Sequence, residues 1–294
     1  MGEIALGVTV FKRIEKLETL LASVDHDTIS HVYVADDGEM TDRKCEVYHR
    51  EYEFPLTVFD LPFDAGLGAG RNRIVEAFDE EYFLLVDSDM EVPHNVDLLR
   101  EQIAQRPSVG GICGMFLEND RFYTPCSDLF VESNTVVKDI RERKRIESVA
   151  GAPFVEFDFV ANAALFRREC LEAYAWDPEY VIGREHIDFY FGHYRETDWR
   201  FGLCPEVQFP HHPGGTQTYE AHRFDADKYD EAERYFLDKW NLDGFVSNKT
   251  TWVDTHDPVY GRKPPFSLLD KARMKYRTGG LGHLLFEGLK YVVK

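Results

Sequence analysis

The apolar positions in the N-terminal part of the chain follow two periods in turn. Short runs of β-branched, leucine and aromatic residues predict buried strands at Ile4–Val10, His31–Ala35, Leu56–Phe59, Tyr82–Val86 and Val109–Phe116. Between these runs, apolar residues recur at helical spacing. The alternation predicts an α/β fold with a mostly parallel sheet and helices on both faces. The ligand crevice of such a sheet lies beyond the carboxyl ends of its strands.

Three helices are expected between these strands. Their apolar faces fall within Leu17–Val24, Ile74–Phe78 and Val96–Ile103. Pro93 is expected at the first position of the third helix, where its missing backbone N–H is tolerated.

The second half of the chain has a less regular pattern. We expect a strand over Phe154–Val160, which Asn162–Phe166 extends, and a further strand over Glu206–Phe209. Helices are expected over Glu185–Tyr194 and, with an amphipathic pattern, over Tyr229–Trp240.

The chain is strongly acidic. Its 294 residues include 53 Asp or Glu and 34 Lys or Arg, for a net charge of -19. Nucleic-acid binding needs a basic footprint, so we expect no nucleic-acid partner. The acids are spread along the chain, which favours the hydrated surface of a halophilic protein. A melting temperature that does not rise with KCl would contradict that hypothesis.

Residues 262–294 are basic instead. They contain eight Lys or Arg and two acids, a net charge of +6. Five apolar residues between Leu281 and Val292 repeat at helical spacing, so we expect a basic amphipathic helical segment. Two interpretations stay open: peripheral contact with an anionic membrane, or packing on the acidic domain. Liposome binding with and without this segment distinguishes them.

The cysteines and the apolar runs predict the cellular compartment. The five cysteines form no Cys-x-x-Cys pair, so we expect neither a disulfide framework nor a structural zinc site. The longest apolar run, Tyr82–Val86, is too short to cross a bilayer, and a strand in place of a leader at Ile4 predicts no signal peptide. We expect a cytoplasmic protein, lying at the inner face of the cell membrane if residues 262–294 contact lipid.

Two acidic pairs follow predicted strands. Asp87 and Asp89, which flank Ser88, aim hard oxygen ligands into the crevice and suit Mg2+ or Mn2+ holding a diphosphate. Asp36 and Asp37 are candidates to accept hydrogen bonds from a nucleobase or ribose. The alternative for both pairs is an acidic turn with no ligand.

A glycine-rich stretch runs from Gly66 to Asn72. Its Gly-x-Gly-x-Gly spacing differs from the dinucleotide-binding fingerprint, so we expect no dinucleotide. A helix that begins at this stretch is a suitable neighbour for phosphate, with Arg71 as a charged contact.

Acidic and histidine residues of the second half are candidates for the remaining chemistry. Glu185 and Asp188 share one helix face, and either could act as a general base. A solvated acidic helix start is the alternative. His211 and His212 could give a nitrogen ligand to the metal, although a loop histidine is often structural.

Taken in order, these clusters resemble the family-2 glycosyltransferases with the GT-A fold. The resemblance covers Ile4 to Trp240 and rests on Thr9–Arg13, Val34–Gly38, Asp64–Gly66, Arg71–Asn72, Asp87–Asp89, Phe166–Arg168, Gly183–Glu185 with Asp188, Pro205–Val207, His211 and Phe236–Trp240. It implies one GT-A domain over residues 1–261, with a nucleotide-sugar half (1–116) and an acceptor half (117–261), followed by the 262–294 segment.

The resemblance also implies the chemistry. It implies an inverting, metal-dependent hexosyl- or N-acetylhexosaminyl-transferase with a nucleoside diphosphate sugar as donor, UDP being the expected carrier and GDP the alternative. The acceptor is expected to be a glycan or a lipid-linked saccharide. The implied donor-binding residues are Thr9, Phe11, Arg13, Asp36, Asp37, Asp64, Gly66, Arg71, Asn72, Asp87 and Ser88. Asp87, Asp89 and His211, with His212 as substitute, are the implied ligands of Mn2+ or Mg2+.

The sequence departs from the family pattern at two places. Asp64 stands where the family usually has Asn, and Glu185 is followed by His186 where the family usually has Asp. The base is therefore expected to be Glu185 or Asp188, with His186 as a lesser candidate. A nucleotidyltransferase and a non-catalytic nucleotide-binding protein are the rival functions; the first normally has a Gly-rich signature where Val10–Arg13 stands here.

Overall fold

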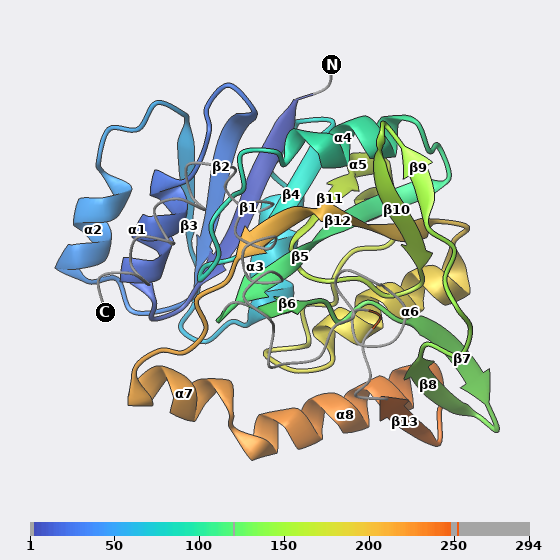
Figure 1. Ribbon diagram of the computed structural model, residues 1–294. Helices are drawn as coiled ribbons and strands as arrows, with labels where there is room; N and C mark the ends of the chain where they lie inside the picture. The colour runs from blue at the N-terminus through green and yellow to red at the C-terminus, as the bar shows by residue number, and fades with distance from the viewer. Residues whose placement is uncertain (1–2, 120, 248–251, 253–294) are drawn as a thin grey trace, which may run out of the picture.

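The computed structural model describes residues 3–119, 121–247 and Trp252. Its centre is a mixed sheet in the order β3-β2-β1-β4-β11-β5-β12-β10-β9, with β6 paired to β5 (Figure 1). The strands of this sheet are β1 (Ile4–Val10), β2 (Ile29–Asp36), β3 (Leu56–Asp60), β4 (Tyr82–Asp87), β5 (Val109–Glu118), β6 (Arg121–Tyr123), β9 (Glu147–Val149), β10 (Ala152–Phe157), β11 (Ala164–Arg167) and β12 (Arg200–Pro210).

The central part of the sheet is parallel except at one strand. β3, β2, β1 and β4 pair in parallel, and so do β5 and β12, whereas β11 is antiparallel to both β4 and β5. The predicted α/β fold with a mostly parallel sheet is confirmed. The carboxyl ends of β1, β2, β4, β5 and β12 therefore meet at one edge.

Helices join the strands and cover the sheet. They are α1 (Ile14–Ala22), α2 (Asp42–Tyr48), α3 (Leu67–Val75), α4 (Asp97–Ala104), α5 (Arg168–Ala173), α6 (Glu185–Glu196), α7 (Gln217–Arg223) and α8 (Ala226–Trp240). Because parallel crossovers are right-handed, α1 and α2 cover one face as the chain moves outward to β3, and α3 covers the other as it returns to β4. Figure 1 shows α7 and α8 lying across the edge where β1 and β4 end.

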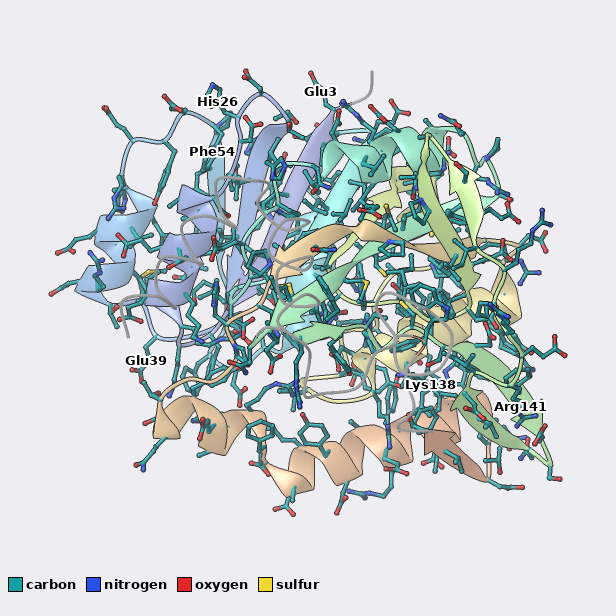
Figure 2. All side chains as sticks on the ribbon, viewed as in Figure 1. Glu3, His26, Glu39, Phe54, Lys138 and Arg141 are labelled. Carbon is teal, nitrogen blue, oxygen red and sulfur yellow. The ribbon has the colours of Figure 1, made fainter. Side chains whose placement is uncertain are left out.

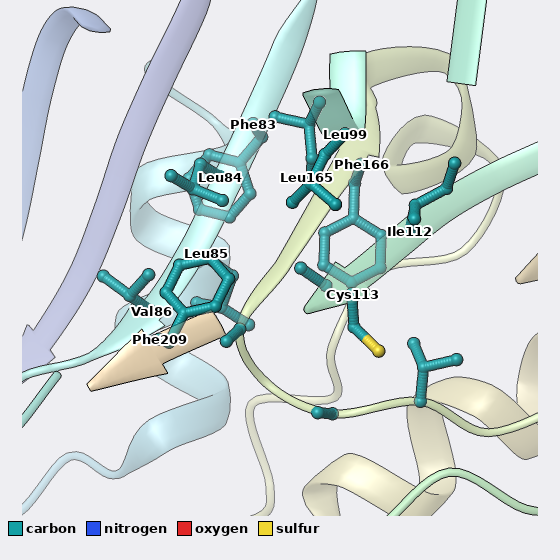
Figure 3. Packing of buried hydrophobic residues seen from close by; sticks show 14 of the residues in the cluster. Phe83, Leu84, Leu85, Val86, Leu99, Ile112, Cys113, Leu165, Phe166 and Phe209 are labelled. Atoms are coloured by element: carbon teal, nitrogen blue, oxygen red, sulfur yellow. The ribbon is translucent and has the colours of Figure 1, made fainter. Parts of the chain in front are cut away.

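The expected single strand over Phe154–Phe166 is wrong, because this stretch forms two separate strands. β10 pairs with β12, whereas β11 inserts between β4 and β5. Glycine makes the insertion possible: a Cβ on Gly111 of β5 would lie 2.6 Å from Cδ1 of Phe166. Figure 3 shows Phe166 packed between β4 and β5 beside Ile112 and Leu165.

Pro93 does not start a helix, contrary to the expectation. The Pro93 carbonyl accepts a hydrogen bond from the Val96 N–H (3.0 Å), which closes a tight turn, and α4 begins only at Asp97. Asn95 in this turn donates its side-chain amide to the Glu206 carbonyl of β12 (2.9 Å). This tertiary hydrogen bond holds the turn against the sheet and delays the helix.

A small second sheet lies beside α8 (Figure 1). It contains β7 (Asp128–Glu132), β8 (Thr135–Asp139) and β13 (Gly244–Ser247), in the order β13-β8-β7. The apolar pattern did not predict this sheet, because its strands are short and only partly buried.

Charged residues cover the outside of the fold. Glu3, His26, Glu39 and Arg141 are exposed side chains at its periphery (Figure 2). Within residues 3–119 and 121–247, no helix is long and apolar enough to cross a membrane. The predicted segment 262–294 lies outside the described residues.

Gly66, which precedes α3, is predicted to tolerate no side chain. It has φ 97° and ψ 167°, a region almost reserved for glycine, and an added Cβ would lie 2.3 Å from Cα of Val181. Gly66→Ala should therefore lower the free energy of unfolding by about 2–5 kcal/mol, from backbone strain and overpacking together. Denaturant unfolding measures this loss.

Gly214→Ala is the matched control for Gly66→Ala. Gly214 also has a positive φ (93°), but an added Cβ would meet nothing within 4 Å. Its loss should reflect backbone strain alone, about 1–2 kcal/mol. Equal losses at the two positions would contradict the close approach of the chain at Val181.

Candidate active site

A cleft opens at the edge where β1, β2 and β4 end, and α7 borders it. Its volume is about 760 Å3, open solvent at its mouth included. The residues that line it are Thr9, Val10, Phe11, Arg13, Asp37, Asp64, Gly66, Leu67, Asp87, Ser88, Asn162, Val181, Ile182, Glu185, Tyr219, His222, Arg223 and Lys228. Nine of them were predicted from the sequence: Thr9, Phe11, Arg13, Asp37, Asp64, Gly66, Asp87, Ser88 and Glu185.

The two aspartates at the end of β2 have different positions. Asp37 lines the cleft and accepts a hydrogen bond from the Gly66 N–H (2.8 Å). Burial raises the pKa of Asp37 to about 6. Asp36 is completely buried, and its carboxylate accepts from Lys44 (2.6 Å), the Gly38 N–H (2.9 Å) and the Tyr48 hydroxyl. Asp36 therefore lies away from the cleft and anchors the loop that carries Asp37, in place of the predicted nucleoside contact.

The contacts of Asp64 give a reason for an acid at the position where the family usually has Asn. It adopts a left-handed backbone (φ 60°) and forms an ion pair with Lys228 at the start of α8. His222 of α7 lies 3.9 Å from the same carboxylate oxygen. The acid that stands here ties α7 and α8 to the glycine-rich stretch across the cleft.

Asp89 is not among the residues that line the cleft, but it lies beside His211 and contacts Arg13, which is one of them. Asp89 is 5% exposed, and its Oδ2 contacts Arg13 and lies 3.5 Å from Nε2 of His211. Burial opposes the ionisation of Asp89, but His211 and Arg13 hold its pKa below the ordinary value. Nδ1 of His211 contacts Glu118 at 2.9 Å. Burial alone would lower the pKa of His211; the carboxylates of Asp89 and Glu118 raise it.

Asp89 and His211 fit a divalent cation as a partial ligand set. A carboxylate oxygen and an imidazole nitrogen 3.5 Å apart are suitable donors, and Glu118 orients the imidazole from its other nitrogen. Among the described residues, no group of three or more His, Cys, Asp or Glu side chains is placed to hold a metal ion. A cation bound here would therefore need further ligands from a substrate, as Mg2+ in phosphate sites commonly does.

His212, the substitute ligand, does not face Asp89. Its side chain is 53% exposed and its Nε2 contacts Glu91 at 2.6 Å. Only its backbone N–H reaches Asp89, by donating to the Asp89 carbonyl (2.8 Å).

Glu185 is the candidate base that lines the cleft. It is the first residue of α6, it is 6% exposed, and it follows a left-handed pair, Gly183 (φ 81°) and Arg184 (φ 56°). Arg184 is held by Glu233 of α8 (2.7 Å), which fixes the turn. Nη1 of Arg71 lies 3.8 Å from Oε1 of Glu185. Arg71 itself is completely buried and does not line the cleft, contrary to the predicted phosphate contact.

Asp188 is not placed to act as a base. It is completely buried and accepts four hydrogen bonds. The donors are the hydroxyls of Tyr174 and Tyr180 (3.1 Å each), Lys239 Nζ (2.8 Å) and Trp240 Nε1 (2.7 Å). Burial alone would lower the pKa of Lys239, but hydrogen bonds to Asp177 and Asp188 raise it. The carboxylate therefore joins α6 to the end of α8.

His186 and Asn72 also lie away from the cleft. Nε2–H of His186 donates to the Val160 carbonyl (2.9 Å), and burial holds the pKa of His186 well below its ordinary value, with the charge of Arg71 adding to the shift. The side-chain amide of Asn72 donates to the Trp176 carbonyl. Both residues therefore tie backbone segments together.

Six polar residues at the site were not predicted from the sequence. They are Glu118, Asn162, Tyr219, His222, Arg223 and Lys228. Glu118 and Asn162 left a usable signal: Glu118 ends a buried strand, as Asp87 does, and Asn162 is a polar residue within an apolar run. The other four come from α7 and the start of α8, where no apolar pattern marks a site.

An aromatic cluster stands at one side of the cleft. The rings of Phe11, Phe63 and His222 lie with centroids 5.2 to 6.0 Å apart. Arg13 lies over the ring of Tyr219, 4.5 Å from its centroid. The cleft thus combines apolar rings, carboxylates and cations, which suits a ligand with a planar ring and a charged group.

Comparisons with known proteins agree with this arrangement. The family model described as Glycosyl transferase family 2 matches residues 6–174, more than half of the 294-residue chain. No curated protein matches the sequence significantly.

Three solved structures are similar in fold, at 13–15% sequence identity. S. aureus TarS 1-349 in complex with UDP-GlcNAc gives a TM-score of 0.54 over 92% of this chain and 70% of its own. GalNAc-T7 with UDP, GalNAc and Mn2+ gives 0.55 over 86% and 57%. The mannosyltransferase PcManGT from Pyrobaculum calidifontis with GDP-Man and Mn2+ gives 0.50 over 100% and 81%.

The position of Asp188 predicts a structural role. Asp188→Asn should lower the free energy of unfolding by about 3 kcal/mol, because it weakens four buried hydrogen bonds and removes the charge that faces Lys239. Asp238→Asn, at an exposed acid of α8, is the control and should change stability by less than about 0.5 kcal/mol. Denaturant unfolding compares the two. If Asp188→Asn lost activity with unchanged stability, the structural role would be contradicted and Asp188 would again be a candidate general base.

Proposed function

The chain belongs to glycosyl transferase family 2, and from this premise we propose that it transfers a sugar from a nucleoside diphosphate sugar to an acceptor hydroxyl, with inversion at the anomeric carbon. One observation carries the proposal: Asp87 at the end of β4 and Glu185 at the start of α6 line the same cleft. Asp87 would serve the donor and Glu185 the acceptor, and both carboxylates face the same cleft.

The donor fits the half of the cleft formed by β1, β2 and β4. Phe11 and the neighbouring rings offer a surface for a nucleobase, and the Asp37 carboxylate offers an acceptor for a base N–H or a ribose hydroxyl. Arg13, Arg223 and Lys228 bring positive charge to the cleft of a protein whose net charge is -19. These cations suit the negative diphosphate.

We propose UDP as the carrier and Mn2+ or Mg2+ as the cation. Structures of similar fold support a nucleotide-sugar donor: TarS is bound to UDP-GlcNAc, and PcManGT to GDP-Man and Mn2+. In this chain Asp89 and His211 would hold the cation next to Arg13, which lines the cleft together with Asp87. The cation would supply positive charge to the leaving diphosphate.

Glu185 is the proposed general base. Its carboxylate takes the proton of the acceptor hydroxyl as that oxygen forms a bond to the anomeric carbon, and the bond from this carbon to the diphosphate oxygen breaks. One in-line displacement of this kind inverts the anomeric configuration.

The proposed acceptor is a glycan or a lipid-linked saccharide. The net charge of +6 in residues 262–294 supports a peripheral contact with an anionic membrane, where a lipid-linked acceptor would be presented. In this proposal residues 1–261 form the domain that transfers the sugar, and residues 262–294 form the segment that contacts the membrane.

The first test of the donor site is calorimetric titration of UDP, and of GDP in parallel, with and without Mn2+ at molar KCl. Wild-type protein should bind UDP more tightly with Mn2+. Asp89→Ala should weaken this binding by roughly 10- to 100-fold, because a metal ligand is lost. Asp128→Ala is the matched control, since Asp128 is also an ion-paired acid of low exposure (15%) but pairs with Lys144 away from the cleft.

Metal-independent binding of UDP, or equal binding by Asp89→Ala and Asp128→Ala, would overturn the metal assignment. No binding of either nucleotide would overturn the donor site as a whole.

The test of the base is Glu185→Gln. It should lower kcat by roughly 10²–10⁴-fold in the hydrolysis of UDP-GlcNAc or GDP-mannose, with water as the acceptor, while UDP binding stays within about threefold. Glu196→Gln, at an exposed acid in the last turn of the same helix, is the control and should match wild type. Unchanged kcat in Glu185→Gln would exclude this residue as the base.

The same assays distinguish the rival functions. Nucleotide binding without any release of sugar would indicate a non-catalytic binding protein. Formation of a sugar nucleotide from a nucleoside triphosphate and a sugar phosphate would indicate a nucleotidyltransferase.

A further inference from the structure

The side chain of Arg71 is buried beneath the cleft without a hydrogen bond. It is 0% exposed, and Nε, Nη1 and Nη2 have no hydrogen-bond partner within the described part of the chain. A buried guanidinium with unmade hydrogen bonds lowers stability, so its presence needs a compensating reason. The reason lies in the charged groups around it.

Two carboxylates lie near this guanidinium, each closest to a different terminal nitrogen. Nη2 lies 3.7 Å from Oδ1 of Asp87, and Nη1 lies 3.8 Å from Oε1 of Glu185. The ring of Trp176 lies 5.5 Å from the guanidinium carbon. Asp87 comes from the donor side of the cleft and Glu185 from the acceptor side, so one cation is shared by the two carboxylates of the proposed reaction.

The position of Arg71 is fixed by the packing of α3. A Cβ on Gly68 would lie 2.2 Å from the Asp177 carbonyl oxygen, and one on Gly70 would lie 2.8 Å from Cγ2 of Thr9. The side chain of Asn72 is bonded to the Trp176 carbonyl. Close contacts on both sides of the helix hold the Arg71 backbone in place, so the guanidinium is a fixed reference for the two carboxylates.

We propose that Arg71 is a positioning residue, which holds the donor-side carboxylate of Asp87 and the base Glu185 in one relation across the cleft. Its charge offsets the repulsion between the two carboxylates, and its planar fork presents a separate nitrogen to each, which a lysine cannot do. The inference rests on the proposed function for the role of Glu185. Arg71 was predicted to contact a phosphate of the donor, whereas here it orients two carboxylates of the protein, Asp87 and Glu185.

The kinetic test compares Arg71→Met, Arg71→Lys and Arg73→Met in the full-length protein. Arg71→Met should lower kcat for hydrolysis of UDP-GlcNAc or GDP-mannose by roughly 10- to 100-fold, because the base loses its alignment, with donor KM within about threefold. Arg71→Lys keeps the charge and should recover part of kcat. Arg73→Met should match wild type, since Arg73 is 43% exposed on the same helix and pairs with Glu76.

Two kinetic outcomes would overturn the proposal. A raised donor KM with unchanged kcat in Arg71→Met would show that Arg71 contacts the donor phosphate. A Met variant as active as the Lys variant would show that the side chain only fills space, because Met keeps the volume and loses the charge.

A second test does not depend on activity. Denaturant unfolding of Arg71→Met, Glu185→Gln and the double variant forms a double-mutant cycle. The decrease in the denaturation midpoint of the double variant should be smaller than the sum of the decreases in the two single variants. Each single variant already removes the Arg71–Glu185 interaction, so the double variant cannot lose it a second time. Additive losses would overturn the proposal. If no sugar nucleotide is turned over by wild type, the proposed function fails, while this cycle still decides whether Arg71 and Glu185 interact.

Discussion

The insertion of β11 between β4 and β5 is the constraint on which the site depends. β11 belongs to the second half of the chain, yet it pairs with β4, which ends at Asp87. Gly111 of β5 leaves room for the Phe166 ring, so the inserted strand packs without displacing its neighbours (Figure 3). The chain that follows β11 must then return past the edge of the sheet, and it delivers Glu185 to the side of the cleft opposite Asp87.

Buried charges fix the loops and helices around this cleft. Asp36 with Lys44 holds the loop after β2, and Asp188 with Lys239 holds α8 on α6. A buried charge is tolerated where its partners and hydrogen bonds are complete, and losing one partner leaves the other uncompensated. The same rule explains why Asp36, predicted to bind the nucleoside, and Asp188, predicted as a base, hold structural elements together instead. Arg71 is the exception, since its hydrogen bonds are unmade and both of its partners face the cleft.

Among the described residues, the cleft of this acidic molecule contains three cations beside four carboxylates. The chain carries -19, yet Arg13, Arg223 and Lys228 line one cavity, and α7 and α8 supply two of them. The Asp64–Lys228 ion pair ties these helices to the glycine-rich stretch. An anionic ligand in the cleft therefore meets three cations placed among four carboxylates, and two of these cations come from helices that lie beyond the matched family model, residues 6–174.

The sequence alone determined the α/β alternation and the candidates that stand at strand ends, because burial imposes a period and strand ends face the crevice. Asp37 and Asp87 were found in this way and Glu185 from its place on a predicted helix, and all three line the cleft. Only the tertiary structure distinguished between acids that look equivalent in the sequence. Asp188 shares a helix face with Glu185, but Asp188 is completely buried in the core and only Glu185 lines the cleft. The tertiary structure also decided the parts played by Glu118, Lys228 and Arg71, since their partners lie far away along the chain and no local period records such contacts.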